Sequence, residues 1–341
     1  MADSLTPFPD LRELRANLAR LARARVAVIG DHALDAYWDL DDAPGEWSQE
    51  TGLATRTVRA QRYAPGGAAN VVANLCALGA CDVRVIGVRG DDPFGRELAR
   101  QLAAVGANTD GLVVDPGEQT LVFVKPIQSG GELARIDFGT HRAPGEVTLA
   151  RLVDCLRAAI GDGCAIVVNQ QVDTGLLARE RAEVFRDALA QAPNRVVVDS
   201  RHHPLVFGPA VLKLNRKEAA AIESRRIDSI DEALSLAREL ARRTANPVHL
   251  TMGARGVLVA HGDSCIHIRG VELPGPIDPV GCGDTFVAAL AAARCVGIGE
   301  VEAARMANLA AAVTVQKTET TGTATPGEIV DLARRFGPST A

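Results

Sequence analysis

Short apolar runs alternate with segments of helical spacing along most of the chain. The apolar runs, each bounded by glycine or polar residues, predict buried strands at 25–31, 83–88, 165–168, 196–198, 211–214 and from 248 onward. Apolar residues at helical spacing predict helices from Leu11 and over 148–160, 175–191, 230–241, 284–294, 300–316 and 326–336. Strands that alternate with helices are typical of a parallel sheet. We therefore expect an α/β fold with a doubly wound, mostly parallel sheet flanked by helices.

Two segments interrupt this alternation. Residues 39–64 are polar and mixed, with only short β-like patches, and residues 120–127 and 133–138 flank a glycine pair in the manner of a hairpin. We expect lid segments of about 36–64 and 119–139 to form a small β-lid, inserted into a single domain that spans residues 1–341. Lys125, Arg135 and Asp137 would be its charged members, and solvated strand faces explain them equally well.

Composition and charge exclude several classes of function. The chain has 341 residues, of which 47% are hydrophobic and 23% charged, and its net charge of −5 is not gathered into runs of one sign. Such a distribution argues against a nucleic-acid partner. No apolar stretch reaches the length of about 18 residues that a membrane helix needs, and no signal peptide is present, so we expect a cytoplasmic protein without a membrane partner. The seven scattered cysteines predict reduced thiols.

The segment 278–284 combines a tight turn with the start of a helix. Gly281 and Gly283 permit the turn, and an apolar run begins directly after Asp284. Backbone N–H groups at a helix start favour an anion such as a phosphoryl group. Asp284 either caps this helix or accepts a proton from a substrate hydroxyl, and the motif taken alone favours capping. Cys282 at the helix start should favour the thiolate, although we expect its backbone to act and not its thiol.

Polar residues follow several predicted strands. They are Asp31 and Asp35, Asn169-Gln170-Gln171, Asn215-Arg216-Lys217-Glu218, and Thr251-Met252-Gly253. In a doubly wound sheet such positions lie along one crevice. Asn215 and Glu218 share a face of the first helical turn, which suits either water around Mg²⁺ or a helix-capping box, and the two interpretations are compatible.

A further glycine pair, Gly66-Gly67, precedes a helix expected at 71–78 with Asn70 as its cap. An ordinary loop with an asparagine cap is the simplest explanation of that segment alone. The chain has no Gly-x-x-x-x-Gly-Lys-Ser/Thr motif and no dinucleotide-binding glycine motif after its first strand. No histidine or cysteine pair is spaced to hold a metal, and His202 and His203 are expected to be surface residues.

Four of these motifs resemble, in order, those of the ribokinase or PfkB-type carbohydrate kinases. Residues 278–284 resemble the family's C-terminal signature, with Cys282 where alanine is usual; 66–70 resemble its glycine motif; Asn215-x-x-Glu218 resembles its magnesium motif; and Thr251-x-Gly253-x-x-Gly256 resembles its nucleotide loop. The resemblance covers about residues 25–335. It implies a ribokinase-like fold and an ATP-dependent sugar kinase that uses Mg²⁺ and acts on a sugar or sugar phosphate.

The resemblance also implies roles for individual residues. The catalytic group would be Asp284, with the backbone of Gly281, Cys282 and Gly283 as the anion hole. Asp35, Gly67 and Asn70 match the sugar contacts. From their positions beside these motifs, after a strand or in the lid, we add Asp31, Gly66, Lys125, Arg135 and Asn169 to the expected substrate-binding set. Nucleotide-binding positions would be Asn215, Thr251, Gly253, Gly256 and Asn308, and Mg²⁺ would be held through water by Asn215 and Glu218. A homodimer through the exposed strand edges of the lid is also implied.

Within the family, the chain resembles kinases that act on heptose 7-phosphate. The residues that carry this likeness are Gly30-Asp31-x-x-Leu34-Asp35-x-Tyr37-Trp38, Ser48-x-Glu50, Arg135-x-Asp137-Phe138 and Ala307-Asn308-x-Ala310-Ala311. The chain departs from those kinases at 169–175, where Asn-Gln-Gln-Val-Asp-Thr-Gly replaces Ser-Asp-Tyr-x-Lys-Gly, and Lys125 stands where arginine is expected. A non-catalytic sugar- or nucleotide-binding regulator and a nucleoside kinase are the alternative functions.

Overall fold

A ten-stranded sheet forms the centre of the computed structural model, which describes residues 4–43, 45–140, 144–317 and 322–337. Its strand order is β1-β15-β14-β13-β12-β11-β10-β2-β5-β6, and the pairs from β13 to β6 are parallel. The members of this parallel part are β2 (Arg25–Gly30), β5 (Asp82–Arg89), β6 (Asn108–Val114), β10 (Ala165–Gln170), β11 (Val196–Ser200), β12 (Val211–Asn215) and β13 (Val248–Thr251). The strands β14 (Val257–His261) and β15 (Ser264–Ile268) continue the sheet in antiparallel pairing, and β1 (Ser4–Leu5) pairs parallel with β15.

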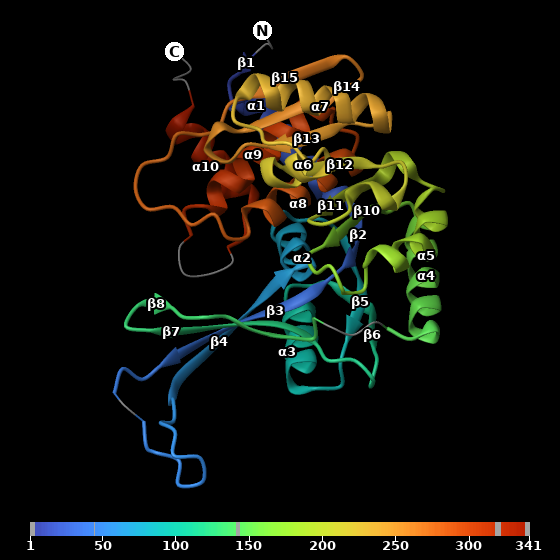
Figure 1. Ribbon diagram of the computed structural model, residues 1–341. Helices are drawn as coiled ribbons and strands as arrows, with labels where there is room; N and C mark the ends of the chain where they lie inside the picture. Colours follow the sequence, from blue (N-terminus) through green and yellow to red (C-terminus); the bar gives the residue numbers. More distant parts are fainter. Residues whose placement is uncertain (1–3, 44, 141–143, 318–321, 338–341) are drawn as a thin grey trace.

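Helices cover both faces of this sheet (Figure 1). One face packs against α1 (Leu11–Arg20), α2 (Ala68–Ala77), α3 (Pro93–Ala104), α8 (Cys282–Cys295), α9 (Glu300–Thr314) and α10 (Pro326–Phe336). The other packs against α4 (Glu146–Gly161), α5 (Arg179–Leu189), α6 (Arg216–Ile222) and α7 (Ile230–Thr244). Alternate residues of β2 enter the two cores: Val26 and Val28 join the first, and Ala27 and Ile29 the second. The expected doubly wound α/β fold is confirmed.

A second, smaller sheet projects from the first (Figure 1), and because it contains most of the segments expected to form a lid, we call it the lid. It contains β3 (His32–Leu40), β4 (Val58–Gly67), β7 (Leu121–Gln128), β8 (Gly131–Glu132) and β9 (Ile136–Phe138). β7 pairs antiparallel with β8 and β9, as expected of a hairpin around the glycine pair. Because β3 begins one residue after β2 ends, Asp35 lies within a lid strand and not in a loop after β2.

The start of α2 differs from the sequence-based expectation. β4 continues to Gly67, which is the N-cap of α2 with φ 53° and ψ −130°. A side chain at Gly67 would bring its Cβ to 2.6 Å from the backbone oxygen of Asp31, so the turn requires glycine. Asn70 therefore lies inside the first turn, and its expected role as the cap is wrong.

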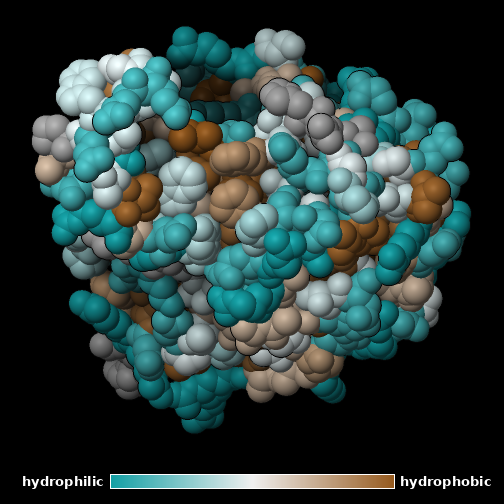
Figure 2. Space-filling model, turned by 90° about the horizontal axis from the view of Figure 1, so that it is seen from below, coloured by the Kyte–Doolittle hydropathy of each residue, from teal (hydrophilic) through white to brown (hydrophobic). Residues whose placement is uncertain are grey.

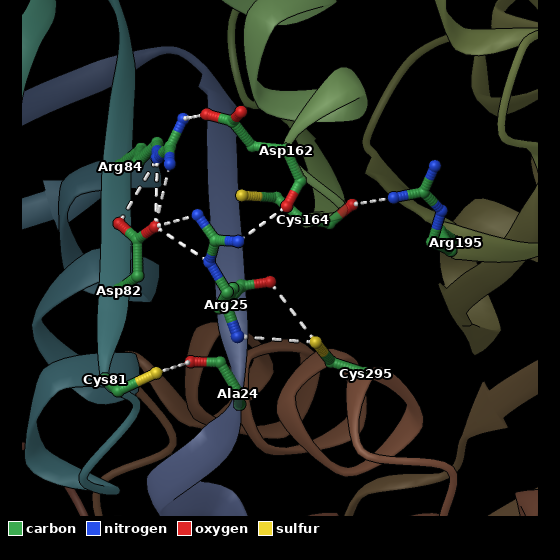
Figure 3. Close-up of polar contacts among 9 residues, drawn as sticks. All are labelled: Ala24, Arg25, Cys81, Asp82, Arg84, Asp162, Cys164, Arg195 and Cys295. Carbon is green, nitrogen blue, oxygen red and sulfur yellow. Dashed lines mark hydrogen bonds and ion pairs between the residues drawn. The ribbon is translucent and has the colours of Figure 1, made fainter.

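Charged residues tie the strands together at their amino-terminal edge (Figure 3). Asp82 of β5 accepts hydrogen bonds from Arg25 of β2 and from Arg84, and Arg84 also donates to Asp162 after α4. The Arg84 hydrogen bonds lower the pKa of the Asp82 carboxyl. This network lies at the opposite end of the parallel strands from the polar residues that follow them.

Four 3₁₀ turns complete the described secondary structure: Leu21–Arg23, Pro193–Arg195, Pro204–Phe207 and Gly253–Arg255. None of the helices in the described ranges is both long enough and apolar enough to cross a bilayer.

Candidate active site

The carboxyl ends of β2 and β10 mark the point where the chain changes direction across the sheet. From β2 the chain continues to β5 and β6 on one side, whereas β10 leads to β11 and β12 on the other. Ligands of open α/β sheets bind in the crevice at such a switch point. Asp31, Asn169, Asp199 and Asn215 all lie at this edge, at the ends of adjacent parallel strands.

The first turn of α8 points free backbone donors at the same crevice. Gly281 is the N-cap with φ 78°, so Asp284 is the third helical residue and makes no capping hydrogen bond. The expectation that Asp284 caps this helix is wrong. Across the described ranges, the N–H groups of Gly283 and Asp284 have no backbone acceptor, whereas Cys282 N–H donates to the Pro279 oxygen at 3.3 Å. Free donors at the positive end of a helix form a site for an anion.

Asp284 is held by a side chain from another helix. The Asn70 amide of α2 donates to its Oδ2 at 2.9 Å. Burial raises the pKa of Asp284 to about 7, against the opposing effects of the Asn70 hydrogen bond and of Lys213, with Asp199 raising it further. Asn74 donates to Asn70 Oδ1 at 3.2 Å and so fixes the orientation of that amide. A carboxylate that titrates near neutral pH suits a general base.

Cys282 does not behave as a thiolate. Burial, followed by the negative charges of Asp278 and Asp284, raises the pKa of its thiol to about 12. The expectation that the helix start would favour the thiolate is therefore wrong, because loss of water and two nearby carboxyls outweigh the helix dipole.

The smaller sheet contributes a buried ion pair. Asp35 of β3 forms an ion pair with Lys125 of β7 at 2.9 Å, and their side chains are only 7% and 12% exposed. Lys125 Nζ also lies 3.3 Å from the Tyr37 hydroxyl. A Cβ at Gly66 would come within 2.7 Å of Asp35 Oδ1, so glycine is needed for β4 to pass this carboxylate. Arg135 instead pairs with Asp137 at 2.7 Å and stacks on the ring of Phe123.

Asp31 holds the segment 169–175, in which the sequence departs from the kinases that it resembles. Its Oδ2 accepts the backbone N–H groups of Gln171 at 2.7 Å and Val172 at 3.0 Å. Burial raises the pKa of Asp31 to about 6 in spite of these bonds. Asn169 is fully buried and donates to Asp199 Oδ2 at 3.3 Å, while it accepts from the Gln171 amide at 3.1 Å.

A cavity of about 450 Å³ lies beside the α8 N-terminus. Four predicted nucleotide residues line it together with Cys282 and Gly283, namely Thr251, Gly253, Gly256 and Asn308. Its remaining lining is mostly apolar and includes Val271, Leu273, Ile277, Phe286, Ala311 and Val315. Asn308 donates to the Arg269 oxygen at 2.9 Å and so holds the wall segment in place. An apolar cleft with a few polar groups is typical of a small-molecule site.

Asn215 and Glu218 form the capping box of α6. Asn215 Oδ1 accepts from the N–H groups of Lys217 and Glu218, and Glu218 Oε2 accepts from Asn215 N–H at 2.7 Å. Burial raises the pKa of Glu218, which Lys213 opposes. Within the described ranges no group of three or more histidine, cysteine and acidic side chains forms a metal cage.

Lys213 and Asp199 belong to this crevice and were not predicted from the sequence. Their side chains are 6% exposed and form an ion pair at 2.9 Å. The sequence did carry one signal, because Lys213 is a lone charged residue inside the apolar run of β12. A lysine is seldom buried in a strand unless its charge is paired with an acidic side chain.

Comparison with known proteins agrees with this fold and these motifs. The Arabidopsis thaliana ribokinase complexed with ribose and ATP superposes with a TM-score of 0.71 at 20% identity, covering 92% of this chain and 99% of that one. The Escherichia coli phosphofructokinase-2 in complex with fructose-6-phosphate gives 0.71 at 18% identity, covering 93% and 100%. The fold is therefore ribokinase-like.

Residues 24–326 match the pfkB family carbohydrate kinases, and the chain belongs to this family. It is 31% identical over 317 residues to the "Bifunctional protein HldE" of Paramagnetospirillum magneticum, covering 91% of this chain and 64% of that protein. The protein of the same name from Geobacter sulfurreducens is 32% identical over 330 residues, with coverages of 94% and 65%. The chain thus spans slightly less than two thirds of the length of these relatives.

Proposed function

We propose that the protein transfers the γ-phosphoryl group of ATP to a hydroxyl of a sugar or sugar phosphate. The observation that carries this proposal is the placement of Asp284. Its carboxyl has a pKa of about 7 and lies beside the free N–H groups at the start of α8. The same helix start borders the cavity that we propose binds the nucleotide. A base, an anion site and a nucleotide-sized cavity at one helix start are what in-line phosphoryl transfer needs.

In the proposed reaction the acceptor oxygen forms a bond to the γ-phosphorus while the bond from that phosphorus to the bridging oxygen of ADP breaks. Asp284 takes the hydroxyl proton, and the N–H groups of Gly283 and Asp284 donate to the phosphoryl oxygens as charge develops on them. General-base catalysis contributes roughly 10²- to 10⁴-fold to such a rate.

The nucleotide would occupy the cavity lined by Thr251, Gly253, Gly256 and Asn308. The solved ribokinase complex with ATP supports this use of the fold. Mg²⁺ fits the same end of the crevice, because one Glu218 oxygen and the Asn215 oxygen are engaged in the capping box and the second Glu218 oxygen stays available for a metal-bound water. When bound, Mg²⁺ would offset charge on the phosphates.

The acceptor would lie between the lid and α2, against Asp35, Asn70 and Lys125. A carboxylate and an amide suit sugar hydroxyls, and the Lys125 ammonium adds an anion-binding group. A heptose 7-phosphate is a natural first acceptor because of the motifs at 30–38 and 135–138. Arg135 is a candidate for its phosphate, since its exposed guanidinium lies on the lid.

An acceptor panel tests the function. ADP release would be measured with Mg²⁺-ATP and ribose, fructose 6-phosphate, a heptose 7-phosphate and a nucleoside in turn. We expect turnover with a sugar or sugar phosphate, and a loss of roughly 10²- to 10⁴-fold in Asp284→Asn with little change in ATP affinity. Turnover with the nucleoside alone would favour a nucleoside kinase, and nucleotide binding without any turnover would favour the regulator.

We also propose a homodimer through the lid. β4 is an edge strand whose outer half is exposed, and Trp47, Leu53 and Val58 nearby are 71%, 68% and 41% exposed. Seen from below, the surface shows hydrophobic residues in separate patches between hydrophilic ones (Figure 2). A free strand edge beside apolar side chains suits pairing with a second copy. Light scattering should give twice the chain mass, and Trp47→Lys with Leu53→Lys should give a monomer.

A further inference from the structure

We propose that Asn74 is a positioning residue for Asp284, because it commits the Asn70 amide to donate to that carboxylate. This inference rests on the proposed function and concerns a side chain that none of the sequence motifs singled out. Asn74 belongs to α2, is fully buried and lies one helical turn after Asn70. Its neighbours Val72 and Leu75 are equally buried and apolar, so an apolar side chain would suit this position if packing were its only task.

An asparagine amide can face a carboxyl group in two ways. With its nitrogen toward Asp284, Asn70 donates to the ionised carboxylate, and with its oxygen toward Asp284 it accepts from the protonated carboxyl. The two orientations fill nearly the same space, so contacts on the other side of the amide must choose between them. The structure has the first orientation, with Nδ2 at 2.9 Å from Asp284 Oδ2. The group behind Asn70 therefore also favours one protonation state of the base.

Asn74 is the group behind Asn70. Its Nδ2 lies 2.9 Å from the Asn70 backbone oxygen and 3.2 Å from Asn70 Oδ1. A backbone oxygen can only accept, so the Asn74 atom beside it must be the nitrogen. An Asn70 amide turned round would bring its own NH₂ group against that nitrogen, and two buried donors without an acceptor are costly. Asn74 thus disfavours the orientation that a protonated Asp284 needs.

Thr285 of α8 holds the other end of the Asn74 amide. Its hydroxyl lies 2.9 Å from Asn74 Oδ1, 3.2 Å from the Gly281 oxygen and 3.0 Å from the Thr314 hydroxyl. A hydroxyl has one hydrogen, and the Gly281 oxygen already accepts from Thr285 N–H at 3.0 Å. Asn74 Oδ1 has no other donor among the residues that the structure describes, so we assign the hydroxyl hydrogen to it. The amide is therefore fixed by both helices that carry the base and its partner.

The balance at Asp284 is close enough for this orientation to matter. Burial raises the pKa of its carboxyl to about 7, and the Asn70 hydrogen bond is the largest of the effects that lower it. Among the charged groups, Asp199 raises this pKa further, whereas Lys213 and Arg201 lower it. The substitutions compared below leave all three charged groups in place. A second orientation of the amide would stabilise the protonated carboxyl and so reduce the fraction of ionised base at neutral pH.

The test measures the ionisation of Asp284 in the protein without substrate. Protein labelled with ¹³C at the aspartate carboxyl carbons would be titrated by NMR, with the Asp284 resonance identified by its loss in Asp284→Asn. The variant is Asn74→Leu, which replaces the amide with an apolar group of similar volume. Its titration midpoint should lie about half a unit to one unit above that of the wild type, because the protonated carboxyl gains one neutral hydrogen bond. The acidic limb of kcat/KM, measured with the acceptor found in the panel, should move equally.

Thr285 offers an independent variant. Thr285→Val removes the donor to Asn74, so the midpoint should move in the same direction but less, since the Asn70 backbone oxygen still holds the Asn74 nitrogen. Thr285→Ser keeps the hydroxyl and should restore the wild-type midpoint. Because Thr285 acts through Asn74, adding Thr285→Val to Asn74→Leu should give no further shift.

The matched control is Thr314→Val. It removes a buried hydroxyl of α9 that contacts Thr285 but leaves the donor to Asn74 in place, so the midpoint should equal that of the wild type. Thermal unfolding would confirm that each variant is folded. A wild-type midpoint in Asn74→Leu would show a purely structural role and overturn the proposal. Absence of turnover with every acceptor of the panel would instead contradict the proposed function, because the midpoints are measured without substrate.

Discussion

The amide of Asn70 opposes the rise in the pKa of Asp284 that burial causes. It donates to the carboxylate and so lowers its pKa, against the stronger effect of burial. In Asn70→Ala the pKa of Asp284 should rise above its value of about 7. Because the base acts when ionised, the acidic limb of the profile of kcat/KM against pH should move to higher pH by about one unit.

The matched control for that prediction is Asn246→Ala. It removes a buried asparagine just before the start of β13, at the amino-terminal end of that strand, whereas the crevice lies at the carboxyl ends of the strands. Its acidic limb should coincide with that of the wild type. An unchanged limb in Asn70→Ala, with KM alone altered, would mean that Asn70 only contacts the acceptor.

Asp284 should also cost stability. Its pKa is 3.8 as a model carboxyl and about 7 in the folded chain, so the folded state holds the proton more tightly than the unfolded state. Its contribution to stability is full below pH 4 and is lost as the pH rises through 7. At pH 8 the free energy of unfolding of Asp284→Asn should therefore exceed that of the wild type by on the order of a few kcal/mol, and the variant should unfold at a higher temperature. Near pH 4 the two proteins should unfold at similar temperatures. Calorimetric scans at both pH values would show this, and a variant less stable than the wild type at pH 8 would contradict it.

At the scale of single residues, the sequence placed Asp31, Asn169 and Asn215 at the carboxyl ends of strands, where the structure has them, but not the contacts that hold each side chain. The tight turn and helix start at 278–284 were predicted from the glycines and the apolar run, whereas the catalytic role of Asp284 came from the family resemblance and stays a prediction. Asn70 and Cys282 were misjudged because a cap and a thiolate depend on where the helix begins and on how much water reaches it. The pairing of Lys213 with Asp199 joins two strands, and no local pattern records it.

At the scale of elements, α6 offers a separation of capping from metal binding. In Glu218→Gln the amide oxygen can still accept the Asn215 N–H group, so the capping box should survive while the negative charge is lost. We expect little change in stability but a several-fold higher Mg²⁺ concentration for half-maximal turnover. Turnover would be measured as a function of Mg²⁺ concentration. The control is Glu232→Gln in α7, where Ser229 and Glu232 form an equivalent capping box. The same Mg²⁺ requirement in both variants would argue against Glu218 as the metal residue.

Most strands and helices of the main sheet could be predicted because their apolar patterns are long and bounded by turns. β3 was missed for a physical reason: it follows β2 after one residue, so Gly30-Asp31 suggested the end of a strand and not a transfer between two sheets. β6 was missed as well, because polar residues fill its first half.

At the scale of the whole molecule, the proposed site is divided between the two sheets. Asp35 and Lys125 belong to the lid, whereas Asn70 and Asp284 belong to helices on the main sheet. Phe94 of α3 links the two parts through ring contacts, 6.3 Å to Tyr63 and 5.6 Å to Phe138 of the lid. The crevice edge could be predicted from strand topology, but the position of the lid over it depends on such long-range packing.

This division predicts different effects of the two substrates on hydrogen exchange. Mg²⁺-ADP should protect the amides around Gly253, Gly283 and Asn308, which line the nucleotide cavity, and leave the lid strands β3 and β7 nearly unchanged. Addition of the acceptor found in the panel should then slow exchange in β3 and β7, because that ligand would bridge lid and body. Mass spectrometry of peptides from both regions would record the two patterns. Full protection of the lid by nucleotide alone would show that the lid responds to ATP and would contradict an acceptor site between the sheets.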